Sequence, residues 1–297
     1  MIASIIDIGT NSCRLMIADS KNNTVNTLIK KVEFTRLGEG VNKTKMLSPE
    51  AVSRTLNVLK EYKKISDSYN SEKILAFATS AVRDSSNREM FLDLVKKECG
   101  ITINCISGTE EGKAAFVGGT SFLDPQSSKV LLVDIGGGST EFSYGLPKKI
   151  PEHVKSFDMG AVRFKEMLDD GVTYTELEKH INSELSKINF INSDFELLGV
   201  AASITGQIAL YHDEAYDPEK SHNKKLTLEI IKDNFHKLSK MSVEEITELP
   251  SVNAKRADVI TSGTFLLLKI LEYFNKNYIL TSEIDLLEGH FILNILN

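Results

Sequence analysis

I-I-D-I-G-T-N-S at residues 5–12 and L-V-D-I-G-G-G-S at residues 132–139 are two copies of one motif. The copies lie 127 residues apart (134 − 7), and Asp, Ile, Gly and Ser are identical in both after two apolar positions. A second pair, I-L-A-F-A-T-S at 74–80 and L-L-G-V-A-A-S at 197–203, follows in the same order at an offset of 123. Two matches at nearly equal offsets predict a duplicated domain.

The stretches around the first copy predict an antiparallel meander, because short apolar or alternating runs are separated by polar turns. Ser48, Pro49 and Glu50 then supply an N-cap, a proline at the first helical position and an acidic first turn, so a helix is expected to follow. The expected strands cover residues 4–8, 13–18, 24–35, 73–79, 101–106, 129–135, 141–144 and 155–157. The expected helices cover residues 49–68, 87–98, 109 onward, 174–191, 227–241 and 257–275.

This order of elements predicts an α/β protein of two similar lobes, because each half has strands first and then strands alternating with helices. The boundary is expected in the polar, proline-containing stretch L-D-P-Q-S-S at 123–128, so that the first lobe covers residues 1–123 and the second begins at 124. A cleft between the lobes would place the two D-I-G turns face to face.

The composition limits the classes of function. Among 297 residues, 35 Lys and Arg against 41 Asp and Glu give a formal net charge of −6, whereas a nucleic-acid-binding protein shows a basic stripe. Hydrophobic content of 41% and charged content of 26% exclude wholesale disorder.

No window approaches the roughly 20 apolar residues of a membrane span, and the start M-I-A-S-I-I-D lacks the basic region of a signal peptide, so a cytoplasmic location is expected. Cys13, Cys99 and Cys105 do not form a disulfide framework or zinc motif and are expected to be reduced thiols.

Asp7 and Asp134 each end an apolar strand before a glycine-containing turn. A carboxylate in such a place is costly to desolvate without a partner. Opposed across a cleft, the two could hold a divalent cation through waters, as Mg²⁺ prefers. The alternative is that each Asp caps its own turn; the repetition of the pair favours the metal site.

The stretch G-G-G-S-T at 136–140 is a candidate phosphate cradle. Glycines let the backbone approach an anion closely and present N–H groups, and the Ser139 and Thr140 hydroxyls would add donors. The alternative is an ordinary hairpin turn. Asn11 and Ser12 are polar at the equivalent place in the first copy, and Arg14 follows on the next strand.

The stretch G-T-E-E-G-K at 108–113 lies between a strand end and a helix start. Acidic residues in a first helical turn are stabilised by the helix dipole, so capping is the simplest interpretation of Glu110 and Glu111. Arg83 is the matching candidate cation, with a solvated ion pair to Asp84 as the alternative.

At these residues the sequence closely resembles the exopolyphosphatase and guanosine pentaphosphate phosphohydrolase family (Ppx/GppA), within the actin-like fold group. The matching stretches cover essentially the whole chain in order: I-D-I-G-T-N-S-C-R-L at 6–15, R-L-G-E-G-V at 36–41, A-T-S-A-V-R-D-S-S-N at 78–87, I-S-G-T-E-E-G-K at 106–113, V-D-I-G-G-G-S-T-E-F at 133–142, M-G-A-V-R-F at 159–164 and R-A-D-V-I at 256–260. D-I-G-G-G-S-T-E together with S-G-x-E-E is specific to the family, whereas one D-I-G turn is shared across the fold group.

The resemblance implies two actin-like (ribonuclease H-like) lobes, with a last helix at about 285–297 packed back on the first lobe and the second lobe covering 124–284. It implies Mg²⁺-dependent removal of a terminal phosphate from a phosphoanhydride chain. Glu111 matches the family's catalytic base, which replaces the capping interpretation there and leaves it for Glu110, and Arg83 matches a catalytic cation. Asp7, Asp134 and Glu141 match the acidic positions around the metal. The positions that match phosphate contacts are Asn11, Ser12, Arg14, Gly136, Gly137, Gly138, Ser139 and Thr140.

Hydrolysis of inorganic polyphosphate is therefore the expected function, with 5′-phosphohydrolysis of guanosine pentaphosphate as the close alternative. A non-catalytic sensor of polyphosphate or an alarmone is an alternative of another class, and Glu111 argues against it, because binding alone needs no base. An actin-like sugar kinase is disfavoured because Ala201 and Ala202 add methyl groups where a nucleotide base would need close backbone approach. The expected partners are the substrates, and neither nucleic acid nor a membrane is expected. Homodimer formation is left as an open possibility. Longer family members carry a further C-terminal region, so short or medium chains are the expected substrates.

Overall fold

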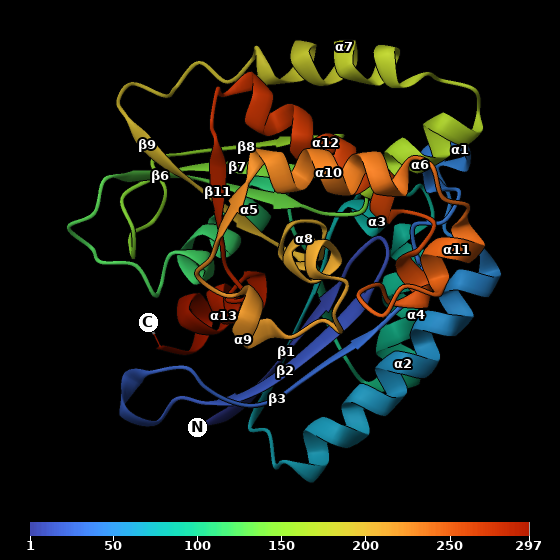
Figure 1. The fold of residues 1–297 in the computed structure, drawn as a ribbon. Helices are drawn as coiled ribbons and strands as arrows, with labels where there is room; N and C mark the ends of the chain where they lie inside the picture. Colours follow the sequence, from blue (N-terminus) through green and yellow to red (C-terminus); the bar gives the residue numbers. More distant parts are fainter. Residues whose placement is uncertain (297) are drawn as a thin grey trace.

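The computed structural model describes residues 1–296, which form two β-sheets covered by helices (Figure 1). The first sheet has the strand order β3-β2-β1-β4-β5. Its strands are β1 (Ile2–Ile8), β2 (Cys13–Asp19), β3 (Asn26–Glu33), β4 (Lys73–Ala78) and β5 (Ile103–Cys105). β1, β2 and β3 pair antiparallel, whereas β4 and β5 continue from β1 in parallel, so the meander expected from the sequence is confirmed.

The second sheet has the order β10-β11-β9-β6-β7-β8. Its strands are β6 (Lys129–Ile135), β7 (Thr140–Gly145), β8 (His153–Phe157), β9 (Phe195–Val200), β10 (Lys225–Thr227) and β11 (Tyr278–Thr281). Read from its other edge, β8-β7-β6-β9-β11 has the same order and the same pairing senses as the first sheet. The two lobes predicted from the repeated motif are therefore present, with β10 as an additional edge strand.

The helices complete both lobes. The longer ones are α2 (Pro49–Ser68), α4 (Arg88–Cys99), α5 (Gly108–Gly119), α6 (Ala161–Asp169), α7 (Tyr174–Leu185), α8 (Ala202–His212), α10 (Leu228–Leu238), α12 (Ile260–Tyr273) and α13 (Leu286–Phe291). The short ones are η1 (Lys21–Asn23), α1 (Val41–Thr44), α3 (Ser80–Arg83), α9 (Pro218–Ser221), α11 (Val243–Thr247), η2 (Ala254–Arg256) and the π-helical turn η3 (Ile292–Leu296).

The helix starts are predicted better than the helix ends. α2 begins at Pro49 as expected, and the Ser48 hydroxyl accepts a hydrogen bond from the Ala51 N–H at 3.2 Å. The helix expected over 174–191 ends earlier, at Leu185. α6, α8, β9, β10 and β11 are not among the expected elements. α8 is buried over most of its surface and so lacks an amphipathic period, and β10 and β11 are too short to show alternation.

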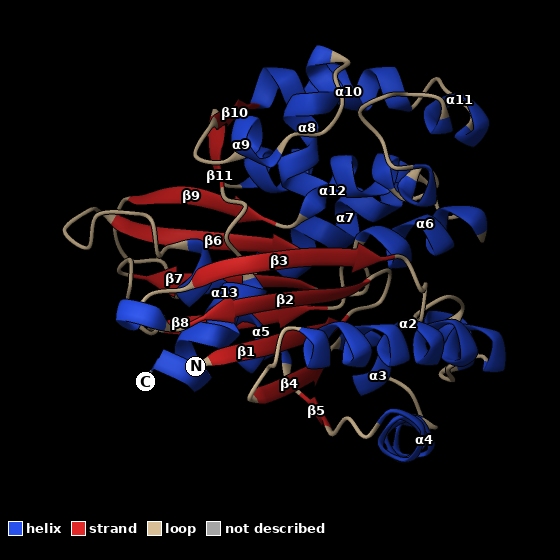
Figure 2. Cartoon of the chain, turned by 90° about the horizontal axis from the view of Figure 1, so that it is seen from below, coloured by secondary structure: helices blue, strands red, loops and turns tan. Residues whose placement is uncertain are grey.

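The helices cover both outer faces, and α5 and α13 lie between the two sheets (Figure 2). On the outer face of the first sheet, Leu59 and Tyr62 of α2 and Phe91 of α4 pack against the strands. On the outer face of the second sheet, the packing comes from α6, α7, α10 and α12, including Phe164 and Phe265. Each lobe therefore has its own core.

The two central helices exchange between the lobes. α5 follows the first sheet in the chain but packs on the second, where Phe116 lies in one apolar cluster with Leu132. α13 follows the second sheet but packs on the first through Phe291. A Cβ on Gly289 would lie 1.8 Å from the Ala114 carbonyl oxygen, so the helices cross at a distance that only glycine allows.

This exchange bears on the lobe boundary, which the sequence places at 123. Because α5 packs on the second sheet, we propose to place the boundary before α5. The C-terminal segment 285–297 then belongs with the first lobe, as the resemblance implies, although residue 297 lies outside the described residues. None of the helices within residues 1–296 is long and apolar enough to cross a membrane.

Candidate active site

A cleft of about 470 Å³ opens between the lobes, and both D-I-G turns line it. Asp7 and Asp134, near the ends of β1 and β6, are only 5% and 8% exposed. Of the predicted site residues, those that line the cleft are Asp7, Asn11, Ser12, Arg14, Glu111, Asp134, Gly136, Gly137, Gly138 and Ser139. Arg83, Thr140 and Glu141 are not among the lining residues.

The two turns have the same internal geometry. The Gly9 N–H donates to the Ser12 carbonyl at 2.9 Å, and the Gly136 N–H donates to the Ser139 carbonyl at 3.0 Å, which is the same bond in both copies. A Cβ on Gly138 would lie 2.5 Å from the Ser80 hydroxyl of the first lobe. The second turn therefore lies directly against the first lobe, and no side chain fits between them.

The backbone of the 136–138 turn, here called the phosphate loop, is held from behind by the first turn of α6. The N–H groups of Ala161, Val162 and Arg163 donate to the carbonyls of Gly136 and Gly137 at 2.9–3.1 Å. In a planar trans peptide the next N–H points away from the carbonyl before it, so the N–H groups of Gly137 and Gly138 point away from α6. The arrangement suits an anion, and phosphate binding by this turn stays a prediction.

The hydroxyl of Thr140 does not take part in this cradle. It is fully buried and donates to the Met159 carbonyl at 2.6 Å. β7 begins at Thr140, and the alternation along the strand directs this side chain into the second lobe, away from the cleft.

Three acidic side chains of the repeated strand pairs are buried close to one another. Arg14 Nε donates to Asp7 Oδ2 at 2.9 Å, whereas Asp7 Oδ1 is buried without a hydrogen-bond partner. The Ser156 hydroxyl donates to Glu141 Oε1 at 2.7 Å, and Glu141 Oε2 is likewise buried without a partner. Burial, and then the charge of Glu141, raise the pKa of Asp134 well above its ordinary value. Burial raises the pKa of Glu141 to about 7.

Glu111 lies in the first turn of α5, beside the helix cap. Ser107 and Glu110 form a capping box, which confirms the capping interpretation for Glu110. Glu111 instead faces the cleft at 8% exposure, and Arg83 Nη1 donates to Glu111 Oε2 at 3.1 Å. Burial, and then the charge of Glu141, raise the pKa of Glu111 well above its ordinary value, although Arg83 acts to lower it. Adjacent glutamates thus have different surroundings.

The donor set fits a hydrated Mg²⁺ ion better than a directly held metal. No group of three His, Cys, Asp or Glu side chains in the described part of the chain is arranged to hold a metal ion. Mg²⁺ usually keeps several waters and takes one or two carboxylates. Asp7 and Asp134 fit this mode, because both line the cleft and Asp7 has a free buried oxygen. Glu141, predicted as a third metal residue, is fully buried off the cleft, so the structure does not place it beside a cleft ion.

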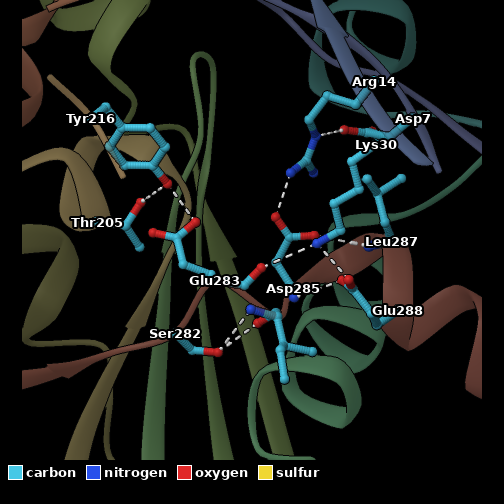
Figure 3. Close-up of polar contacts among 11 residues, drawn as sticks. Asp7, Arg14, Lys30, Thr205, Tyr216, Ser282, Glu283, Asp285, Leu287 and Glu288 are labelled. Atoms are coloured by element: carbon cyan, nitrogen blue, oxygen red, sulfur yellow. Dashed lines mark hydrogen bonds and ion pairs between the residues drawn. The ribbon is translucent and has the colours of Figure 1, made fainter. Parts of the chain in front are cut away.

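Sequence reasoning finds Arg14 but misses the charged residues that surround it, Lys30, Asp285 and Glu288 (Figure 3). Arg14 Nη1 donates to Asp285, and Lys30 on β3 forms an ion pair with Glu288 at 2.5 Å. Burial acts to raise the pKa of Asp285, but the charges of Arg14 and Lys30 hold it below its ordinary value. The D-L-L-E pattern at 285–288 could have been recognised only as a helix start, which it is.

The turn before α8 contains Ala201 and Ala202, the residues that disfavour a sugar kinase in the sequence argument. Ala201 has φ 68° and ψ 158°, a combination that is essentially restricted to glycine. Ala201 and Ala202 both line the cleft. The methyl groups on which the sequence argument depends are therefore in the cleft.

Comparisons with known proteins test the family resemblance. The Ppx/GppA phosphatase family matches residues 16–297. The chain is 40% identical to the bifunctional 3-dehydroquinate synthase/phosphatase of Fusobacterium nucleatum over 98% of its own length and 46% of that protein's, so it spans about half of this relative. It is 28% identical to exopolyphosphatase 2 of Mycobacterium tuberculosis over 96% of this chain and 95% of that one.

A solved structure shows the same fold. The crystal structure of the Ppx/GppA family member of Aquifex aeolicus is similar, with a TM-score of 0.83 and 34% identity, covering 100% of this chain and 98% of that one. The two-lobed actin-like fold implied by the resemblance is therefore confirmed. With its fold, its cleft and its family match in agreement, the chain belongs to the Ppx/GppA phosphatase family.

Proposed function

We propose that the protein is an exopolyphosphatase, which hydrolyses the terminal phosphoanhydride bond of inorganic polyphosphate and releases orthophosphate with the help of Mg²⁺. The observation that carries the proposal is Glu111. It is a buried carboxylate on the cleft wall that is not needed to cap its helix, is paired with Arg83, and shares the cleft with the phosphate loop. Relatives named as exopolyphosphatases support the choice of substrate.

In the proposed reaction, the loop N–H groups and Arg14 hold the terminal phosphoryl group. A water molecule lies in line with the bond to be broken, and Glu111 accepts a proton from it. The water oxygen bonds to the terminal phosphorus, the bridging P–O bond breaks, and the shortened chain leaves with the electron pair. Such a reaction depends on position and charge rather than on covalent chemistry by the protein. Mg²⁺, held by Asp7 and Asp134, would supply further neutralisation of phosphate charge.

Arg83 has two tasks in this proposal. Its donation to the Ile106 carbonyl at 3.2 Å and to Glu111 at 3.1 Å fixes the base against the strand that precedes α5. Burial acts to lower the pKa of Arg83, but the charge of Glu111 raises it, so the guanidinium stays charged. Because Arg83 lies behind Glu111 and does not itself line the cleft, its charge would act on the reaction through the base that it holds.

The test compares two adjacent glutamates. Phosphate release is measured with purified protein and Mg²⁺ on polyphosphate of defined length, for wild type, Glu111→Gln and Glu110→Gln. A positioned general base contributes roughly 10²–10⁴-fold, so Glu111→Gln should lose about that factor in kcat. Glu110→Gln retains the capping box and should keep near-wild-type activity. Wild-type turnover by a folded Glu111→Gln would remove Glu111 from the mechanism.

The close alternative is hydrolysis of guanosine pentaphosphate, which also ends in a phosphoanhydride and uses the same chemistry. The same assay on both substrates gives the ratio of kcat/KM that separates them. If wild type releases phosphate from neither and still binds tripolyphosphate, a non-catalytic sensor becomes the better reading.

A further inference from the structure

Arg163, in the first turn of α6, connects the phosphate loop to the opposite lobe. Its Nε donates to the Gly138 carbonyl at 2.9 Å, its Nη1 donates to Asn42 Oδ1 at 2.5 Å, and its Nη2 donates to Asp84 Oδ2 at 3.2 Å. The side chain is 12% exposed. One guanidinium therefore contacts the loop of the second lobe and two side chains of the first lobe.

The contact with Gly138 completes the support of the phosphate loop. The carbonyls of Gly136 and Gly137 accept from backbone N–H groups of α6, and Arg163 takes the third carbonyl, that of Gly138. With all three carbonyls turned toward α6, planar peptides turn the N–H groups of Gly137, Gly138 and Ser139 the other way. The orientation of the Ser139 N–H group thus depends on the Arg163 side chain and not on the backbone of α6.

The contact with Asp84 extends to the candidate base. Asp84 Oδ1 lies 3.7 Å from Arg83 Nε, and Arg83 in turn donates to Glu111 at 3.1 Å. Arg163, Asp84, Arg83 and Glu111 thus form a continuous chain of charged contacts from the phosphate loop to the base. The chain passes through the first lobe at Asp84 and Arg83 and meets the second lobe at both ends, at Arg163 of α6 and at Glu111 of α5.

We propose that Arg163 is a positioning residue that fixes the phosphate loop relative to Glu111 through the first-lobe residues Asp84 and Arg83. The effect on kcat rests on the proposed function. The effect on binding of a phosphoanhydride chain can be measured even if the protein does not hydrolyse it. A guanidinium suits the task, because its planar fork holds three acceptors at once, whereas a lysine ammonium is a single point charge. Misplacement of a bound group by about 1 Å can cost roughly 10²-fold in rate.

A second ion pair between the lobes provides the matched control. Lys43 Nζ lies 2.8 Å from Asp170, and these side chains are 73% and 55% exposed. The pair joins the same two lobes near Arg163 but does not touch the phosphate loop. If Arg163 only held the lobes together, loss of Lys43 would have a similar kind of effect.

The experiment measures kcat and KM on polyphosphate for Arg163→Met, Arg163→Lys, Asp84→Asn, the double variant Arg163→Met with Asp84→Asn, and Lys43→Ala. Affinity for inorganic tripolyphosphate is measured by calorimetry in a Glu111→Gln background, where the ligand is not consumed. Thermal unfolding and the calorimetric stoichiometry report the folded fraction. Arg163→Lys keeps the positive charge, and it replaces Arg163→Met as the test variant if Arg163→Met does not fold.

We expect Arg163→Met to lower kcat about 10–100-fold and to weaken tripolyphosphate binding at unchanged stoichiometry, with Arg163→Lys between it and wild type. Lys43→Ala should stay within about twofold of wild type. Adding Asp84→Asn to Arg163→Met should cause little further loss, since coupled neighbours are not additive. The proposal would be overturned if folded Arg163→Met kept wild-type kcat and wild-type affinity for tripolyphosphate. If Arg163→Met does not fold, the same result in folded Arg163→Lys would overturn it. Fully additive losses from Arg163→Met and Asp84→Asn in the double variant would overturn it too. If wild type itself releases no phosphate, the proposed function fails while the binding comparison still decides the role of Arg163.

Discussion

The free energy of unfolding is expected to decrease between pH 5 and pH 8, and replacing Glu141 with Gln should make this decrease smaller. Glu141 is fully buried, and burial raises its pKa to about 7 from 4.5. A carboxyl group whose pKa is higher in the folded protein stabilises the fold in its protonated form. That stability is complete below the unfolded pKa near 4.5 and is lost as the pH rises through about 7. At about 1.4 kcal/mol per pKa unit, the difference corresponds to about 3 kcal/mol.

The assay is urea unfolding of wild type and Glu141→Gln at pH 5, 6, 7 and 8, with chelator present to remove divalent cations. The wild-type free energy of unfolding should fall across this range, and that of Glu141→Gln should fall less, by up to about 3 kcal/mol. Asp134 and Glu111, whose pKa values are also raised, keep a residual slope in the variant. Glu110→Gln is the control, because Glu110 is not part of the buried cluster. Parallel pH profiles for wild type and Glu141→Gln would refute the reasoning.

Three further predictions concern the backbone and the metal. Ala201→Gly should raise the free energy of unfolding by about 1 kcal/mol in urea denaturation, because Ala201 has a backbone conformation suited to glycine (φ 68°, ψ 158°). Gly289→Ala should destabilise the protein by about 1–3 kcal/mol, seen as a lower Tm, because its methyl group would lie 1.8 Å from the Ala114 carbonyl oxygen. Mg²⁺ should raise the Tm more at pH 8 than at pH 5.5, because protons compete with the cation for Asp7 and Asp134, whose pKa values are raised. Equal shifts at both pH values would contradict carboxylate binding.

The fold is largely predictable from the sequence, because the duplication leaves the same motif after the first strand of each lobe, β1 and β6. The exchange of α5 and α13 is not predictable in this way. Both helices have ordinary local signals, including capping boxes at Ser107 and Asp285, and neither signal says which sheet the helix covers. Packing on the distant sheet is decided by the apolar surfaces that the folded lobes present to each other.

The candidate site is predictable only where its residues belong to the repeated turns. Glu110 and Glu111 have the same chemistry and adjacent positions, and local reasoning cannot tell the capping residue from the one that faces the cleft. Asp285 meets Arg14 from 271 positions away, and Arg163 meets Asp84 from 79 positions away. The first pair forms when α13 packs on the first sheet and the second forms between the lobes, so no spacing in the sequence marks them.

The duplication also explains why the two sides of the cleft differ in charge. Arg14 lies opposite Asp7 in the register of β1 and β2, and Glu141 lies opposite Asp134 in the register of β6 and β7. The same position of the repeat, 127 residues apart (141 − 14), is thus a cation in one copy and an acid in the other. In the first copy, the guanidinium compensates the aspartate. In the second copy, two buried carboxyl groups adjoin, and each raises the cost of ionising the other. The first turn is therefore balanced by its own guanidinium, while the second has an excess of negative charge that a proton or a metal cation must compensate. A single lobe would supply only one of these two arrangements, so the charge pattern of the cleft depends on the divergence of the two copies at this position.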